Sequence, residues 1–174
     1  MKHLYRIINA RPHDVHSIGA IEIAAARLFE GYVPDEVLHE TTGEQDLQEA
    51  QSEGRLWVAL AGESPIGFAH VEVFDPISAH LEEIDVHPDH GRRGVGTRLV
   101  TEVCKWAWKR GYRAVTLTTF RDVPWNMPFY LRLGFEEIPK RELTPGLRAI
   151  LRSEARRGLD PRRRVAMRWW VPFR

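Results

Sequence analysis

Apolar residues along this chain follow two kinds of pattern, one of which predicts strands and the other helices. Short apolar runs are typical of strands, and apolar residues that recur every three or four positions indicate amphipathic helices. Gly31, Gly111 and Gly134 each end a helical stretch. We expect strands over 4–8, 55–60, 66–74, 81–86, 114–120, 135–138 and 165–171, and helices over 12–30, 94–110, 124–133 and 145–157. Mixed strands and helices of this kind predict an α/β fold.

Two local features refine this pattern. The segment Ala61-Gly62-Glu63-Ser64-Pro65 separates two strand-like runs and predicts a hairpin turn. In the strand over 81–86, the apolar residues Leu81, Ile84 and Val86 break strict alternation. We therefore expect a β-bulge between positions 81 and 84, which would re-aim one of the two glutamates there.

Length and composition favour one domain over 1–174. The chain has 174 residues, of which 43% are hydrophobic, enough for a core of ordinary size. A basic, helix-like insertion spans about 144–160, before the last strand, and is expected to cover a site or to contact a partner. The single Cys104 excludes an internal disulfide and is interpreted as a core residue.

Charge and hydropathy exclude several classes of protein. The formal net charge is only +1, so the run Arg162-Arg163-Arg164 is interpreted as a solvated basic face rather than a nucleic-acid surface. No stretch approaches the about 20 apolar residues of a membrane span, and no signal peptide is evident. We expect a cytoplasmic protein without membrane or nucleic-acid partners.

The most informative segment lies between the strand over 81–86 and the helix that follows it. Gly91, Gly94 and Gly96 permit a tight turn at the positive end of a helix, which predicts a phosphate cradle, and Arg92, Arg93 and Arg98 add positive charge. The glycine spacing does not fit a dinucleotide-binding fingerprint, and no Lys-Ser or Lys-Thr pair follows as in a P-loop.

This segment resembles the GNAT superfamily of acetyl-CoA-dependent N-acetyltransferases, whose signature is Q/R-x-x-G-x-G/A between a strand and a helix. Gly91-Arg92-Arg93-Gly94-Val95-Gly96 matches both glycine positions, with Gly91 in place of the usual Gln or Arg. The later block 125–135 is similar to the family's N…FY…GF element and contains Asn126 and Tyr130. Both blocks occur at the separation that the family's architecture requires.

The resemblance implies a mixed, mostly antiparallel sheet of six to seven strands, flanked by helices and splayed at the acetyl-CoA site. In such a fold Tyr130 is the general acid toward the CoA thiolate, and acetyl passes directly to a primary amine in a ternary complex. The implied acetyl-CoA-binding residues are Ile84, Asp85, Val86, Gly91, Arg92, Arg93, Gly94, Val95, Gly96, Thr97, Asn126 and Tyr130.

Several alternatives stay open at this point. Glu83 or Glu82 is the candidate general base, beside the option that positioning and water suffice. Trp125 either lines the acceptor pocket or anchors a short helix, and Phe29, Tyr32 and His39 fall where the family shapes the acceptor side. We expect no metal site. A non-catalytic acyl-CoA-binding module is the alternative function, and a homodimer is possible because dimers are common in the family.

Overall fold

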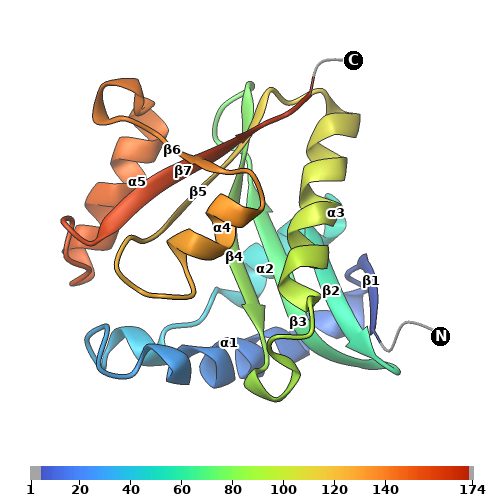
Figure 1. The fold of residues 1–174 in the computed structure, drawn as a ribbon. Helices are drawn as coiled ribbons and strands as arrows, with labels where there is room; N and C mark the ends of the chain where they lie inside the picture. Colours follow the sequence, from blue (N-terminus) through green and yellow to red (C-terminus); the bar gives the residue numbers. More distant parts are fainter. Residues whose placement is uncertain (1–4, 173–174) are drawn as a thin grey trace.

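A computed structural model describes residues 5–172 of the chain, which form a seven-stranded sheet in the order β1-β2-β3-β4-β5-β7-β6 (Figure 1). All neighbouring strands are antiparallel except β4 and β5, which are parallel. The strands are β1 (Tyr5–Asn9), β2 (Leu56–Ala61), β3 (Ser64–Glu72), β4 (Ser78–Val86), β5 (Ala114–Phe120), β6 (Glu136–Glu137) and β7 (Arg164–Trp170). The predicted α/β fold with a mostly antiparallel sheet is confirmed.

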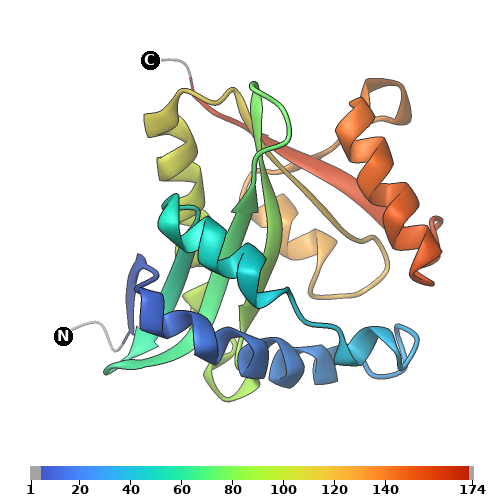
Figure 2. The ribbon, with the colours of Figure 1, turned by 180° about the vertical axis from the view of Figure 1, so that it is seen from behind.

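Helices cover both faces of this sheet. α3 packs on one face and α1 and α2 on the other, as the two opposite views show (Figures 1 and 2). Figure 2 also shows α5 on the side of α1 and α2, next to β7. The helices are α1 (Ile18–Ala26), α2 (Glu44–Ser52), α3 (Val95–Arg110), α4 (Met127–Arg132) and α5 (Pro145–Arg156), with 3₁₀ turns over Pro12–Ser17, Arg27–Phe29, Val37–His39, Pro88–His90 and Lys140–Glu142.

The core has a layer on each side of the sheet, and β2 contributes to both. Trp57 and Ala59 pack in the layer under α3, whereas Leu56, Val58 and Leu60 pack in the layer under α1 and α2. Because successive side chains of a strand point to opposite faces, a strand buried on both sides reads as a continuous apolar run. This accounts for the unbroken sequence Leu56-Trp57-Val58-Ala59-Leu60-Ala61.

The sheet opens in its middle, between β4 and β5. These strands pair only over Ser78–His80, opposite Ala114–Thr116, although β4 continues to Val86 and β5 to Phe120. At the last paired position, the Nδ1 atom of His80 lies 2.9 Å from the Thr116 hydroxyl, and burial lowers the pKa of His80 to about 4. A neutral histidine therefore sits where the strands diverge, and the second half of β4 has a free backbone edge.

The structure differs locally from three sequence predictions. The hairpin turn contains only Gly62 and Glu63, and Pro65 belongs to β3. A proline is tolerated there because β4 pairs with β3 only from Gly67 onward, so no neighbouring strand requires an N–H group at position 65. The first helix is α-helical only over Ile18–Ala26 and has 3₁₀ turns at both ends. β4 begins at Ser78 rather than at 81. Leu4, in the first predicted strand, lies outside the described residues.

Candidate active site

The turn between β4 and α3 exposes a row of backbone donors. Gly94 precedes the helix with φ +77°, and Arg92 has φ +56°, an uncommon value for a residue with a side chain. Within residues 5–172, no group accepts a hydrogen bond from the backbone N–H groups of 92–97. Such alternating left-handed turns at a helix N-terminus form a concavity that binds anions. The turn therefore has free backbone donors at the place where the glycines predict a phosphate cradle.

The arginines around this turn have separate roles. Arg98 donates a 2.8 Å hydrogen bond to the Tyr5 carbonyl, and Arg93 donates one of 3.1 Å to the Tyr5 hydroxyl. Both therefore join the turn to β1. Arg92 is exposed and makes no ion pair or hydrogen bond with the described residues. Arg92 is the cation that is free to approach an anion.

The predicted bulge in β4 is present and decides which way the glutamates point. His70 pairs with Glu83 and Val71 pairs with Leu81, so Glu82 is the extra residue. As a result Leu81 and Ile84 both pack toward α3, and the alternation places Glu83 on the opposite face. Burial, followed by the charges of Glu22 and Glu82, raises the pKa of Glu83 to about 7. Glu83 can therefore exchange a proton near neutral pH.

Tyr130 lies on the other wall of the opening, on α4. Its ring makes edge-to-face contacts with Phe129 and Phe135, with centroids 5.0 and 5.7 Å apart, and the residue is only 8% exposed. Burial, and then the negative charges of Glu83 and Asp85, raise the pKa of Tyr130. No described group is hydrogen-bonded to its hydroxyl, although the residue lines the cavity. The hydroxyl is therefore a protonated donor without a protein partner.

Asn126 precedes α4 and joins it to β5. Its Nδ2 atom donates a 2.9 Å hydrogen bond to Thr119 Oγ1, which fixes the amide orientation. The Oδ1 atom is buried and has no hydrogen-bond partner among the described residues. A buried acceptor without a partner costs free energy of folding. Asn126 thus holds an unused acceptor at the cavity wall, which a ligand N–H group can satisfy.

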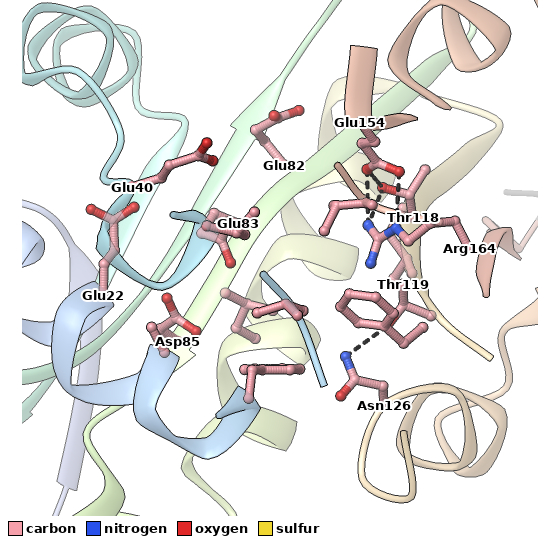
Figure 3. Close-up of a pocket in the computed structure, with 18 of the residues that line it drawn as sticks. Glu22, Glu40, Glu82, Glu83, Asp85, Thr118, Thr119, Asn126, Glu154 and Arg164 are labelled. Carbon is pink, nitrogen blue, oxygen red and sulfur yellow. Dashed lines mark hydrogen bonds and ion pairs between the residues drawn. The ribbon is translucent and has the colours of Figure 1, made fainter. Parts of the chain in front are cut away.

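The cavity between the splayed strands has a volume of about 230 Å³, and glutamates from distant segments close it. Figure 3 shows Glu22 and Glu40 gathered on the same side as Glu83 and Asp85 of β4, with Glu154 and Arg164 across from them. Glu154 forms a buried 2.8 Å ion pair with Arg164 and accepts a hydrogen bond from Thr118. Glu22 accepts from the Thr42 N–H and hydroxyl groups, and its burial raises its pKa.

Sequence analysis did not single out Glu22, Glu40 or Glu154. Glu22 lies on the buried face of α1, between Ile18 and Ala25, and Glu154 lies seven positions after the buried Leu147 on α5. A single carboxylate on the apolar face of a helix indicates a functional residue, because burying a charged group without a partner costs free energy of folding. That signal was available in the sequence for Glu22 and Glu154.

The structure also places the other candidate residues. Phe29 lines the cavity, whereas Trp125 packs against Tyr32 with ring centroids 5.3 Å apart and is 41% exposed. The insertion covers the site, because Glu154, Arg157 and Leu159 line the cavity. Burial raises the pKa of Cys104 to about 12, as expected for a core thiol.

The arginine run near the C-terminus is not a solvated face as a whole. Arg162 pairs with Asp160, Arg163 with Asp122, and Arg164 turns inward to Glu154. The expected solvated face holds for the exposed Arg162, whereas acidic partners distant in sequence draw Arg163 and Arg164 toward the protein. Over residues 5–172, no group of three or more His, Cys, Asp or Glu side chains could hold a metal ion. In that same range, no helix is long and apolar enough to cross a membrane.

Comparison with other proteins places this architecture in a family. Residues 24–135 match the model of the acetyltransferase (GNAT) family. An uncharacterized N-acetyltransferase of Methanocaldococcus jannaschii is 44% identical over 59 residues, which cover 34% of this chain and 26% of that protein. N-acetyltransferase 8F1 of Rattus norvegicus is 33% identical over 96 residues, which cover 52% of this chain and 43% of that protein. The matches thus span less than half the length of these two relatives.

Solved structures agree at the level of the whole fold. The PaiA N-acetyltransferase of Thermoplasma acidophilum, crystallised with coenzyme A, superposes with a TM-score of 0.73 at 18% identity. The superposition covers 95% of this chain and 98% of that one. It therefore includes the splayed sheet and the helices on both of its faces. With the family model matching well over half of its length, this chain belongs to the GNAT family of acetyltransferases.

Proposed function

We propose that this protein is an acetyl-CoA-dependent N-acetyltransferase that transfers acetyl to a primary amine within a ternary complex. Family membership and the splayed sheet support this assignment. The observation that carries it is the hydroxyl of the buried Tyr130, which has no described hydrogen-bond partner, on a residue that lines one cavity with the half-buried Glu83. A proton donor and a proton acceptor thus share a cavity between the open strand edges.

The donor substrate occupies the free edge of β4 and the turn that follows it. The His87 N–H donates to the Ile66 carbonyl, so by alternation the backbone groups of Ile84 and Val86 face the opening. These groups pair with the pantetheine amides as an added strand would. The pyrophosphate takes the N–H groups of 92–97, with Arg92 nearby. Asn126 Oδ1, buried and without a partner, accepts from an N–H group of the cofactor arm.

The reaction forms a C–N bond and breaks a C–S bond. Glu83, with a pKa of about 7, takes the proton of the acceptor ammonium directly or through one water. The neutral amine attacks the thioester carbonyl, and the tetrahedral oxyanion is stabilised by a backbone N–H of β4. As the C–S bond breaks, Tyr130 donates its proton to the CoA thiolate, and the second proton that the attacking nitrogen loses restores the Tyr130 hydroxyl through solvent. Holding amine and thioester together in one cavity supplies a further part of the acceleration.

Substitution of Tyr130 by Phe tests the assignment. Tyr130→Phe removes only the hydroxyl, and we expect kcat to fall about 10²–10⁴-fold, as for loss of a general acid, with little change in the KM for acetyl-CoA. Tyr112→Phe, which removes the hydroxyl of a tyrosine that stacks on Trp106 and does not line the cavity, is the matched control and should retain full activity. Full turnover by Tyr130→Phe would contradict the role of general acid. A wild-type protein that binds acetyl-CoA but consumes none with any amine would instead be a non-catalytic acyl-CoA-binding module.

A further inference from the structure

We propose that His70 is a positioning residue for Glu83: its Nδ1 atom accepts a hydrogen bond from the Glu83 carboxyl after that group has taken the proton of the acceptor. This inference rests on the proposed function and adds a residue to its proton chemistry. Three observations support it: the pairing of His70 with Glu83 across two strands, a contact with Glu72 that leaves one ring nitrogen free, and the burial of that nitrogen without a partner.

His70 and Glu83 lie directly opposite each other on neighbouring strands. β3 and β4 are antiparallel, and His70 pairs with Glu83 at the last position before the bulge. Directly paired residues of antiparallel strands point to the same face of the sheet, with their Cβ atoms about 5 Å apart. Both residues also line one surface hollow beside the cavity. A rotation of the Glu83 side chain is therefore sufficient to bring its carboxyl group to the imidazole ring.

The contact between His70 and Glu72 fixes the tautomer of the ring. His70 Nε2 lies 2.7 Å from Glu72 Oε1, and the other oxygen of Glu72 lies 3.4 Å from Arg55 Nη1. Because an ionised carboxylate can only accept a hydrogen bond, the ring proton belongs on Nε2. Nδ1 then keeps its lone pair and is a hydrogen-bond acceptor.

The Nδ1 atom of His70 is buried and has no hydrogen-bond partner among the described residues. A buried acceptor of this kind costs free energy until a donor reaches it. An ionised Glu83 cannot be that donor, because a carboxylate carries no proton, whereas a protonated Glu83 presents one O–H group. His70 therefore distinguishes the two forms of Glu83 and binds only the protonated one.

The surroundings of His70 act in both directions on its protonation. Burial lowers the pKa of His70, and the charge of Glu72 opposes this effect. The charged groups that share its hollow or act on its charge are Glu22 on α1, Glu40 before α2, Asp46 and Glu49 on α2, Arg55 before β2, Glu72 on β3, Glu82 and Glu83 on β4, and Arg157 after α5. Because burial is the largest effect, His70 is neutral near pH 7, where Glu83, with a pKa of about 7, takes up its proton.

This contact gives the Glu83 carboxyl a place to go after it has acted as base. Glu83 removes a proton from the acceptor ammonium, and its O–H group then turns from the amine to His70 Nδ1. The proton stays on the Glu83 oxygen until solvent in the hollow accepts it, so no other bond forms or breaks at this step. The hydrogen bond stabilises the protonated form, which makes Glu83 a stronger base, and it keeps the proton away from the attacking nitrogen.

Two substitutions of His70 separate the roles of its ring nitrogens. The amide of His70→Asn ends near the position of Nδ1, and the amide of His70→Gln ends near that of Nε2. The measurement is kcat/KM against pH, with the full chain, acetyl-CoA and the primary amine of highest turnover in a panel. In His70→Gln the acid limb should move about one pH unit lower, because the protonated carboxyl loses one hydrogen bond, and the plateau should fall about threefold. In His70→Asn the amide oxygen can still accept, so the limb should stay near its wild-type position.

A measurement on the free protein does not depend on turnover. The ¹⁵N chemical shifts of the His70 ring should show a proton on Nε2 and a bare Nδ1 at pH 8, and the Nδ1 shift should change with a midpoint of about 7 as Glu83 protonates. In Glu83→Gln the amide can donate to Nδ1 at every pH, so this change should vanish. Glu49→Gln, which removes another carboxylate from the same hollow, is the matched control and should keep it.

The outcomes distinguish this role from two others. An acid limb at higher pH in His70→Gln, or protons on both ring nitrogens at pH 8, would overturn the proposal and make His70 a cation that stabilises the ionised Glu83. An unchanged limb in His70→Gln, or an Nδ1 shift without a midpoint of about 7, would also overturn it and leave His70 a structural residue. No acetyl-CoA consumption with any amine would instead contradict the proposed function, and the titration of the free protein would still test the contact of His70 with Glu83.

Discussion

The two ends of the proposed site are built in opposite ways. The donor end is one contiguous segment, from Val86 to Thr97, whose backbone N–H groups and exposed Arg92 provide positive potential. The acceptor end is assembled from α1, the connection before α2, β4, α5 and β7, and six of its eight charged side chains are carboxylates. In the proposed site, backbone groups therefore bind the anionic acetyl-CoA, whereas side chains from separate elements bind the amine acceptor.

This difference has an energetic consequence. The N–H groups of the turn stay exposed to water in the free protein, so the donor end costs little stability. The acceptor end buries Glu83 and Asp85 without basic partners, which raises their pKa and stores unfavourable electrostatic energy. We expect substitutions at the donor end to change acetyl-CoA affinity, and substitutions at the acceptor end to change rate, pH dependence and stability together.

After Tyr130→Phe, the largest effect should come from Glu83→Gln. We expect kcat/KM to fall about 10²-fold, as for loss of a general base. Because the base acts in its ionised form, wild-type activity should rise with pH through about 7, and this limb should be absent in the variant. The measurement is a pH–rate profile with the preferred amine. Glu82→Gln, at the exposed bulge position, should keep the limb; its loss there would transfer the role to Glu82.

The same variant should be more stable than the wild type at alkaline pH. The folded pKa of Glu83 lies above its unfolded value, so ionisation above about pH 7 opposes folding, and this cost disappears as the pH falls and the folded carboxyl protonates. Thermal unfolding should therefore show a higher Tm for Glu83→Gln than for wild type at pH 8, with a smaller difference at pH 5. Equal differences at both pH values would contradict burial of a charged Glu83.

At the donor end, Gly94→Ala should raise the KM for acetyl-CoA about tenfold, because the helix-start N–H groups lose their orientation. Gly111→Ala is a matched control at the other end of α3: both glycines have positive φ, and an added Cβ would meet nothing within 4 Å at either. Both variants should lose about 1 kcal/mol of stability. Equal KM values for acetyl-CoA in the two variants would contradict the cradle.

The smallest effect should follow from Arg92→Ala, about threefold on the KM for acetyl-CoA and diminishing at high salt, since an exposed charge contributes weakly. Arg93 already donates to Tyr5, so Arg93→Ala should lower stability more than it changes that KM. Steady-state kinetics at two salt concentrations, with thermal unfolding of both variants, checks this. The reverse pattern would make Arg93 the anion-contacting residue.

Sequence patterns predicted the strands and helices well where the periodicity was long, as in α3, and the bulge in β4 from the spacing of Leu81, Ile84 and Val86. They were less accurate at the first helix, where 3₁₀ turns surround a short α-helix, and at the hairpin, where Pro65 belongs to a strand. Pairing of β3 with β4 begins only at Gly67, and this register cannot be predicted from the residues around the turn alone.

The sequence alone determined the contiguous part of this protein: the glycine turn, the helix that follows it and the element containing Tyr130, because each depends on residues close together along the chain. Only the tertiary structure decided that β4 and β5 separate after His80, and that Glu22, Glu40 and Glu154 converge on Glu83. The tertiary structure also decided that Arg164 points inward and pairs with Glu154. Charges on separate elements meet only when the core packs, so the acidic acceptor end could not be predicted from spacing.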